Sequence, residues 1–278
     1  MKLNQAQIRL DVERALLEDV GSGDVTAALL PANQQITAQL ICREPLLLAG
    51  QAWVTEVFRQ LDPELRLDWL VWEGQWVAEP QTLCTLAGNA RSLLTGERCA
   101  LNFLQTLSAT ATQTWHYVQA LKGTKTTLLD TRKTLPGLRY AQKYAVACAG
   151  GQNHRLGLYD AFLIKENHIR ACGSIAKALQ QARAMHPELL LEIEVETLEE
   201  LAQALAGRPD RILLDNFSLP ELRAAVDMNQ PKICPLEASG GFHLGNIREV
   251  AETGVDYISV GAITKSVQAI DLSLLVKD

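Results

Sequence analysis

Hydrophobic and polar positions in the first 120 residues follow two different periods. Residues 1–20 place apolar side chains at helical spacing among charges, which predicts an amphipathic helix with Ile8, Val12 and Leu16 on one face. Short alternating segments follow within residues 36–88 ("ITAQLICRE", "LRLDWLVW", "QTLCTLAG"), and proline turns separate them. They predict an antiparallel sheet. A proline-free apolar-periodic stretch over residues 93–122 predicts one or two helices leading out of it.

From about residue 124 the pattern changes to short apolar strands separated by helical segments. The six strands are "TTLLDT", "DAFLIKEN", "LLLEIEVE", "DRILLDN", "KICPLEAS" and "DYISVGA". Repeated βα units predict a parallel sheet, but periodicity does not distinguish a barrel from an open doubly wound sheet. About 155 residues are too few for a regular eight-unit barrel of roughly 250. We therefore expect an incomplete α/β barrel of about six to seven strands.

Composition narrows the function. The chain has 278 residues, 47% of them hydrophobic, and a formal charge of −6, so it can bury a large core and does not resemble a general nucleic-acid or membrane-surface binder. Residues 130–170 are an exception, with seven lysines and arginines against three acids, a local charge of +4. The positive charge is thus concentrated in one segment.

Cysteine usage and the N-terminal pattern bear on the compartment. The six cysteines are scattered without a CxxC pair, which suits reduced core thiols better than a zinc site or disulfides. Residues 1–20 lack the apolar core of a signal peptide, and no run reaches the roughly 18 apolar residues of a membrane span. We expect a cytoplasmic protein.

Polar residues end almost every strand of the predicted parallel sheet. In such architectures the site lies at the carboxyl ends of the strands, so these side chains are expected to converge on one cavity. In chain order they are Thr131, Arg132 and Lys133; Lys165, Glu166, Asn167 and His168; Glu192, Glu194 and Glu196; Asp215 and Asn216; and Glu237, Ala238 and Ser239.

The three glutamates of "EIEVE" have period two and point to one face of their strand. Buried carboxylates are costly without cations, so one interpretation is an exposed edge strand with a solvated face. The other is that Glu194, with Asp215 at the next strand end, binds a hard divalent cation such as Mg²⁺. The carboxylate pair does not decide between them.

Two glycine-containing loops follow the last two strands. Ser239, Gly240 and Gly241 precede one helical segment, and Gly261 and Ala262 precede another. Backbone N–H groups and helix N-termini at these places can bind a phosphate. Ordinary tight turns would need the same glycines.

The cations are the most specific feature. Arg132, Lys133, His154, Arg155 and Lys165 occupy strand ends or the "GGQNHR" loop, which predicts a strongly anionic ligand. The alternative is surface salt bridging, which we favour for Arg139, Lys143 and Arg170.

The motifs "DTRKTLPGLRYAQKYAVACAGGQNHRLGLYDAFLIKENHI", "EVETLEEL", "LLDNF", "EASGGF" and "GVDYISVGAITKS", in this order and spacing, resemble quinolinate phosphoribosyltransferases. The resemblance covers nearly the whole chain, including "EDVGSGDVT" and "TGERCALNFLQ". It implies an N-terminal α/β sandwich domain over residues 1–115, joined by the tail at about 267–278, and an α/β barrel domain over 116–266. It also implies a homodimer, with assembly into hexamers left open.

The resemblance also implies an activity. Quinolinate and 5-phosphoribosyl 1-diphosphate would give nicotinate mononucleotide, CO₂ and diphosphate with Mg²⁺, in NAD biosynthesis. No nucleic acid or membrane would be a partner.

Carried over by position, substrate binding falls to Thr131, Arg132, Lys133, His154, Arg155, Lys165 and, across the dimer interface, Arg98. Lys133 faces the diphosphate, while Glu194 and Asp215 bind Mg²⁺ and the ribose hydroxyls. These three residues are assigned to catalysis. Ser239, Gly240, Gly241, Gly261 and Ala262 hold the 5-phosphate.

Three alternatives remain open. A barrel aldolase or lyase could use Lys165 as a Schiff-base amine. A paralogue of the same fold, of the kind found with molybdenum-transport proteins, would act on another acceptor. A silent anion-binding scaffold would bind ligand without turnover.

Overall fold

The structure is a computed structural model that describes residues 2–277. The chain forms two compact units. The first comprises the residues up to 115, residues 135–150 and those from 266 onward, and the second comprises residues 116–134 and 151–265. In the described part of the chain, no helix has the length and apolar character needed to cross a bilayer.

The first unit begins with helix α1, Gln5–Val20, as the N-terminal pattern predicts. Asn4 precedes it, and its Oδ1 accepts hydrogen bonds from the N–H groups of Ala6 and Gln7 at 3.1 and 3.2 Å. Such a cap satisfies N–H groups that the first turn leaves without a helical partner. Ile8 and Val12 are fully buried, so the predicted apolar face is the packed one.

The sheet of the first unit is antiparallel, which confirms the prediction from alternation. Its strand order is β12-β1-β5-β3, with bounds Leu272–Lys277, Gln35–Cys42, Gln81–Asn89 and Arg66–Trp69. A short pair, β2 (Leu46–Leu47) and β4 (Trp76–Val77), forms a second sheet. The C-terminal strand β12 pairs with β1, placing Leu274 opposite Leu40.

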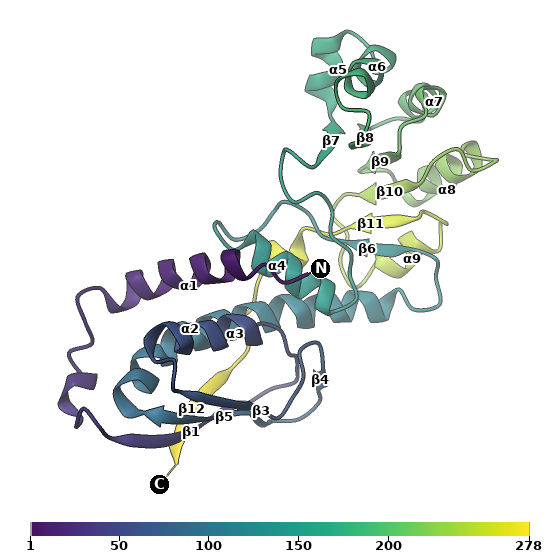
Figure 1. The fold of residues 1–278 in the computed structure, drawn as a ribbon. Coiled ribbons are helices and arrows are strands. Elements are labelled where there is room, and N and C mark those ends of the chain that lie inside the picture. Colours follow the sequence, from purple (N-terminus) through teal and green to yellow (C-terminus); the bar gives the residue numbers. More distant parts are fainter. Residues whose placement is uncertain (1, 278) are drawn as a thin grey trace. The chain divides into compact units, whose positions relative to one another are not determined.

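Helices cover one face of that sheet (Figure 1). They are α2 (Gln51–Leu61) and the first part of α3 (Ala90–Ala120), with a 3₁₀ turn at Ala27–Leu29 and α4 (Arg139–Cys148) in the same unit. The stretch that was predicted to form one or two helices forms the single helix α3. The reading of residues 36–88 as strands alone was wrong, because α2 buries Trp53, Val57 and Phe58 at helical spacing.

The second unit contains the six predicted parallel strands. They are β6 (Thr127–Leu129), β7 (Ala161–Ile164), β8 (Leu190–Val195), β9 (Arg211–Asp215), β10 (Leu236–Ser239) and β11 (Tyr257–Ser259). The order β6-β11-β10-β9-β8-β7 follows the chain as a barrel would, but β6 and β7 are the two edges. A single parallel bridge joins Leu129 to Gln152 beside this opening. The expected incomplete barrel is confirmed.

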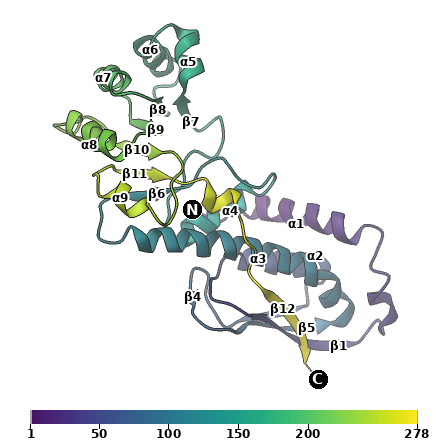
Figure 2. The same cartoon turned by 180° about the vertical axis from the view of Figure 1, so that it is seen from behind.

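Helices flank this sheet along its length, as both views show (Figures 1 and 2). They are α5 (Glu166–Cys172), α6 (Ile175–Met185), α7 (Leu198–Gly207), α8 (Leu219–Met228), α9 (Ile247–Ala251) and α10 (Ala262–Lys265). Leu191 of β8 lies by Leu179 of α6, so the odd-numbered side chains of β8 face the helices. The even-numbered ones face the other side of the sheet.

Candidate functional site

The inner face of the parallel sheet carries its charges in layers. Leu163 pairs with Glu192 and Glu192 with Arg211, while Glu237 pairs with Tyr257. Neighbours in register point to the same face of the sheet. Glu237 also pairs with Leu213, two residues beyond Arg211, and the ion pair between Arg211 and Glu237 joins it to Glu192 and Arg211 in one layer of charges. Glu194, two residues beyond Glu192, belongs to the next layer toward the carboxyl ends.

Strand β8 lies between β7 and β9, so the edge-strand interpretation of "EIEVE" was wrong. Glu192 is fully buried, Glu194 is partly buried, and Glu196 follows the strand and is exposed. The cost of burying two carboxylates must therefore be met by cations on neighbouring elements.

Lys165, which immediately follows β7, supplies one of those cations. Its Nζ forms an ion pair with the carboxylate of Glu194. The lysine side chain is 47% exposed and that of Glu194 12%. The pair therefore stands at the mouth of the strand-end site, where a ligand could displace one partner.

The end of β6 and the second glycine loop are in contact. The Oγ1 of Thr131 accepts a hydrogen bond from the N–H of Lys133 at 3.1 Å, and the hydroxyl of Thr264 donates to the carbonyl oxygen of Lys133 at 2.8 Å. A Cβ on Gly261 would lie 2.9 Å from Cδ of Lys133. Glycine at this position therefore leaves room for the side chain of Lys133 against the loop predicted to hold phosphate.

The end of β9 and the first glycine loop meet in the same way. Asn216, with a φ of 59°, donates from Nδ2 to Oδ2 of Asp215 at 2.8 Å, and its N–H donates to the carbonyl oxygen of Ser239 at 2.8 Å. Gly240 has a φ of 133°, and a Cβ there would lie 2.8 Å from Oδ1 of Asn216. Asp215 and this loop are thus neighbours.

Each glycine loop was predicted to lead directly into a helix, and this holds for only one of the two loops. Ala262 begins α10 directly, as expected. The loop containing Ser239 to Gly241 continues through further turns before α9 begins at Ile247. Any phosphate bound by the first loop would therefore contact loop N–H groups rather than a helix N-terminus.

Arg155 lies among other charges. Burial lowers the pKa of its guanidinium, as does the neighbouring charge of Arg132, while Glu192 is the largest of the acids that oppose the shift. Its Nη1 donates to the carbonyl oxygen of Ala161 at 3.4 Å. The charges of the two arginines therefore act on each other, as two cations that bind one dianionic ligand would.

His154 is placed differently from the strand-end cations. Its Nε2 lies 3.0 Å from Oε2 of Glu192 and 3.6 Å from Oε2 of Glu237. Its Nδ1 accepts a hydrogen bond from the N–H of Arg155 at 2.8 Å. The His154 ring therefore points toward the layer that contains Glu192 and Glu237.

Sequence reasoning missed that layer as a cluster. Arg211 Nη1 lies 3.0 Å from Oε2 of Glu237, and the Arg211 guanidinium carbon is 4.3 Å from the ring centroid of Tyr257. Burial raises the pKa values of Glu192 and Glu237, and the nearby charge of Glu192 adds to the shift at Glu237. Alternation on β8 placed Glu192 correctly, but Arg211 starts its strand and carried no such signal.

The remaining predicted cations are found in several settings. Arg170 pairs with Glu166 on α5, which confirms it as a surface charge. Lys143 is fully buried on α4, so its assignment to a solvated face was wrong, because that side of α4 is packed. Arg139, at the start of the same helix, is half-buried. Arg98 lies on α3 in the first unit with a side chain 60% exposed.

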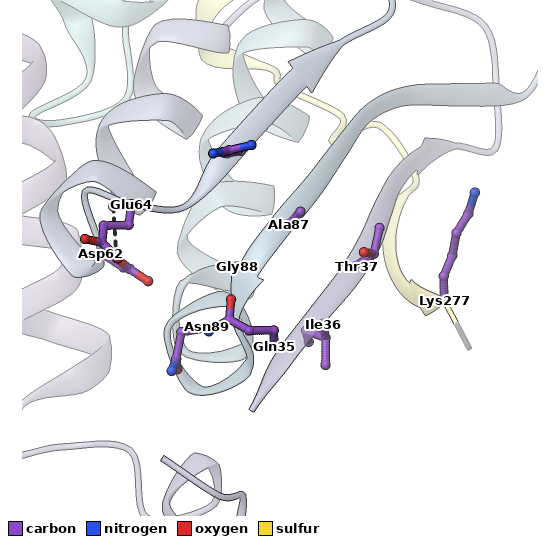
Figure 3. A pocket seen from close by; sticks show the side chains of 10 residues that line it. Gln35, Ile36, Thr37, Asp62, Glu64, Ala87, Gly88, Asn89 and Lys277 are labelled. Carbon is purple, nitrogen blue, oxygen red and sulfur yellow. Dashed lines mark hydrogen bonds between the residues drawn. The ribbon is translucent and has the colours of Figure 1, made fainter. Parts of the chain in front are cut away.

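A wide hollow of the first unit contains none of the predicted site residues. It has a volume of about 1040 Å³, and strands β1, β3, β5 and β12 contribute to its lining (Figure 3). Arg66, Glu64 and Lys277 in its lining are all exposed. Solvated charges of both signs are ordinary for a polar sheet face, and we assign this hollow no chemistry.

Together, the fold and the strand ends define a class of protein: an open α/β barrel with cations, acids and glycine turns at its strand ends, an arrangement suited to anionic, phosphorylated ligands. Two family models match the chain. The N-terminal domain of quinolinate phosphoribosyl transferase matches residues 24–108, and the C-terminal domain of the same family matches residues 110–275. The chain belongs to the quinolinate phosphoribosyltransferase family.

Relatives and solved structures agree with this assignment. A nicotinate-nucleotide pyrophosphorylase [carboxylating] of Mycobacterium leprae is 45% identical over 273 residues, covering 95% of each chain. A probable enzyme of the same name from Bacillus subtilis is 38% identical, covering 98% of this chain and 94% of that one. The structure of the nicotinate-nucleotide pyrophosphorylase from Francisella tularensis is 48% identical, with a TM-score of 0.96 over 99% of this chain and 98% of that one.

Proposed function

We propose that the chain transfers the phosphoribosyl group of 5-phosphoribosyl 1-diphosphate to quinolinate, giving nicotinate mononucleotide, CO₂ and diphosphate for NAD biosynthesis. The observation that carries the proposal is the joint placement of Lys133 beside Gly261, Asp215 beside Gly240, and Lys165 beside Glu194 at the strand ends of one sheet. A dicarboxylate and a polyphosphorylated sugar need such a set of cations, acids and glycine turns.

In this proposal Arg132, Arg155 and Lys165 hold the two quinolinate carboxylates, with Thr131 beside them and His154 beneath. Arg98 of the partner subunit completes this set in a homodimer, and further assembly of the dimers into hexamers is left open. The exposure of Arg98 is compatible with such a role, because a solvated guanidinium is free to meet a ligand of a neighbouring chain.

Mg²⁺ fits the acids at the mouth of the site. Glu194 and Asp215 come from adjacent strands and offer hard carboxylate oxygens, the ligands that Mg²⁺ prefers. These two residues would hold the ion, which would neutralise charge on the diphosphate when bound. Their carboxylates also accept hydrogen bonds from the ribose hydroxyls.

The residues of the chain act mainly by positioning. Lys133 neutralises the leaving diphosphate as the bond to the ribose C1 breaks, while Ser239, Gly240, Gly241, Gly261 and Ala262 donate N–H groups to the 5-phosphate. Nearby carboxylates stabilise the positive charge that develops on the ribose.

The pyridine nitrogen of quinolinate then donates its electron pair to C1 and becomes a pyridinium. The adjacent carboxylate leaves as CO₂, and its bonding electrons remain on the ring carbon beside the positive nitrogen. A proton from solvent completes nicotinate mononucleotide. No protein nucleophile is needed.

The decisive test is an assay of CO₂ and diphosphate release from quinolinate and 5-phosphoribosyl 1-diphosphate, with and without Mg²⁺. We expect equal amounts of both products. Turnover of another acceptor without quinolinate turnover would favour the molybdenum-associated paralogue, and ligand binding without turnover would favour a scaffold. Borohydride trapping of a carbonyl substrate on Lys165 would favour a lyase, although the ion pair of Lys165 with Glu194 opposes that chemistry.

Arg132→Ala tests the quinolinate assignment within this function. Loss of a charge partner should weaken quinolinate binding or turnover by about 2–5 kcal/mol. Near-wild-type kinetics would overturn the role of Arg132.

Mixing Arg98→Ala and Lys165→Ala variants tests the shared site. Mixed dimers would contain one intact site, so activity should partly return. No recovery would contradict the proposed contribution of Arg98 of the partner subunit.

We expect the enzyme to be cytoplasmic. Fractionation of cells that express the enzyme tests this location.

A further inference from the structure

The buried layer beneath the strand-end site is the feature that the proposed mechanism does not use. It contains Glu192, Glu237, Arg211 and the ring of His154, with Tyr257 beneath the guanidinium of Arg211. We name these five residues the inner layer. Glu192 and Glu237 are fully buried, so each charge here carries a large desolvation cost.

The tautomer of His154 follows from its contacts. Nδ1 accepts a hydrogen bond from the N–H of Arg155 and so cannot itself carry a proton. The single ring proton is then on Nε2, which faces Oε2 of Glu192 at 3.0 Å. In this arrangement the imidazole is neutral, and its two nitrogens face the N–H of Arg155 and the carboxylate of Glu192.

The backbone on either side of the ring is also fixed. The N–H of His154 donates to Oδ1 of the buried Asp130 at 2.8 Å, and Asn153 donates from Nδ2 to Oδ2 of Asp130 at 2.7 Å. Asp130 therefore holds the loop before Arg155, and the His154 ring holds the N–H of Arg155 itself. The start of the Arg155 side chain has little freedom left.

The inner layer could also be read as a metal site, because His154, Glu192 and Glu237 offer ligand atoms that all lie within 4.8 Å of one another. Charge argues against this reading. Arg211 already faces Glu237 at 3.0 Å, and Arg155 is electrostatically coupled to Glu192. These two guanidinium groups already supply positive charge to both acids, so a divalent cation would add uncompensated positive charge in a buried place.

We propose that the inner layer is a positioning network: Glu192, Glu237 and Arg211 fix His154 as the neutral Nε2–H tautomer, and His154 in turn places Arg155 to bind a ligand carboxylate. His154 is then a positioning residue and not itself a ligand of quinolinate. The inference rests on the proposed function for the identity of the ligand, but the tautomer and the network are properties of the free protein.

The first experiment reads the tautomer directly. Protein labelled with ¹⁵N in its five histidine rings is examined by NMR with and without quinolinate, and His154→Gln assigns the signal. We expect an unprotonated Nδ1 and a protonated Nε2 in both states. A doubly protonated ring, or a ring whose Nε2 signal shifts to that of a new anionic partner on adding quinolinate, would overturn the proposal.

The second experiment separates positioning from a general loss of structure. The assay is run above pH 8, where Glu237 with its pKa of about 8 is ionised. Glu237→Gln then keeps the size of the side chain but replaces a charged acceptor by a neutral amide against Arg211 and the Nε2–H group, so Arg155 should lose its support. Quinolinate KM should rise about tenfold, as for other supporting residues of a binding site, while kcat and the KM of the phosphoribosyl donor stay within about twofold. Glu199→Gln, on the exposed side of α7, is the matched control.

A conservative exchange supplies rescue. Arg211→Gln should raise quinolinate KM as Glu237→Gln does, and Arg211→Lys should restore part of the loss because a cation again faces Glu237. Equal increases in both substrates' KM values, or no change in quinolinate KM, would contradict the network.

Calorimetry with Zn²⁺ and with quinolinate tests the metal-site interpretation and the proposed function. Binding of one Zn²⁺ per chain that Glu237→Gln abolishes would make the inner layer a metal site and overturn the proposal. If the wild type neither binds nor converts quinolinate, the proposed function fails, whereas the ring tautomer of the free protein still decides the network.

Discussion

Asp11 in the first unit and Glu237 in the second are both almost fully buried acids, and their neighbours differ in kind. Asp11 accepts hydrogen bonds from the amide of Gln7 at 2.7 Å and from the indole of Trp53 at 3.1 Å. Glu237 faces the guanidinium of Arg211, the ring of His154 and the second acid of its layer.

The half-buried Glu73 extends the comparison. Its two carboxylate oxygens accept from the N–H groups of Gly50 and Gln51 at 2.7 and 3.1 Å, at the start of α2. Asp11 and Glu73 thus meet neutral donors and complete an indole contact or a helix start. Neutral donors satisfy an acid without requiring another buried charge.

The two sheets differ in the same sense. Charged side chains on the first sheet, such as Arg66 and Lys277, are exposed and solvated. On the inner face of the second sheet, charges are buried and face other charges. Structures keep such expensive clusters mainly where a site needs them, so burial among charges, and not the number of charges, marks the functional unit.

Replacing Arg211 tests this contrast with the largest expected effect. Above pH 8, where Glu237 with its pKa of about 8 is ionised, Arg211→Ala leaves this buried acid without its counter-ion and should lower the free energy of unfolding of the second unit by about 3–5 kcal/mol. Arg66 is the matched control, since it also begins a strand but is exposed, and Arg66→Ala should change stability by no more than about 0.5 kcal/mol. Urea unfolding of both variants measures the difference. Equal losses of stability would show that burial among charges does not set the cost.

Two glycines with almost the same backbone conformation give the next effect. Gly240 has a φ of 133° and Gly23 a φ of 135°, but only at Gly240 would a Cβ meet another residue, 2.8 Å from Oδ1 of Asn216. Gly240→Ala should therefore displace Asn216 and its partner Asp215, lowering kcat/KM about 100-fold.

Gly23→Ala carries only the backbone strain, roughly 1–2 kcal/mol, and should leave kcat/KM unchanged. Steady-state kinetics on both variants, with circular dichroism to confirm folding, check the pair. Equal activity of the two would show that the Gly240 loop does not support the site.

Much of the fold could be predicted because its signals are local. The period of α1, the alternation of β1 and β5, and the six apolar strands each lie within a few residues of sequence. Helix α2 was not predicted because Trp53, Val57 and Phe58 lie between strand-like segments, which obscure the helical spacing of these three residues. The pairing of β12 with β1 joins the two ends of the chain, which periodicity cannot reveal.

The site could be predicted in part for the same reason. Period two placed Glu192 and Glu194 on one face of β8, and strand ends located Lys165 and Asp215. The direction of the His154 ring and the place of Arg211 depend on register between strands, which links residues far apart in sequence. Lys143 was assigned to a surface because a lysine on a helix usually is, and its burial depends on tertiary packing.

The pH dependence of stability sharpens the comparison between the acids. Burial and the charge of Glu192 raise the pKa of Glu237 from 4.5 to about 8. The folded state therefore binds this proton more tightly than the unfolded state. The resulting stabilisation is complete below pH 4.5 and is lost as the pH rises through about 8.

Across that window, the Glu237 proton should make the free energy of unfolding fall by up to about 1.4 kcal/mol per pH unit. Glu237→Gln should remove this contribution from the slope. Urea unfolding at a series of pH values measures it. Parallel curves for the wild type and the variant would show that Glu237 is charged throughout and that the inner layer is arranged differently.

The smallest expected effect concerns an ion pair of the second unit whose two side chains are solvent-exposed. Arg183 of α6 donates from both terminal nitrogens to the carboxylate oxygens of Asp210 at 3.0 Å, with side chains 38% and 43% exposed. Solvent screens such a pair, so Arg183→Ala should lower the free energy of unfolding by about 0.2–1 kcal/mol. Asp210 keeps its bond from the N–H of Leu191 at 2.7 Å in this variant, so the start of β9 stays in place. Urea unfolding beside Arg211→Ala then compares two arginine–carboxylate pairs of one unit that differ chiefly in burial. A loss at Arg183 as large as that at Arg211 would show that membership of the second unit, and not burial among charges, sets the cost.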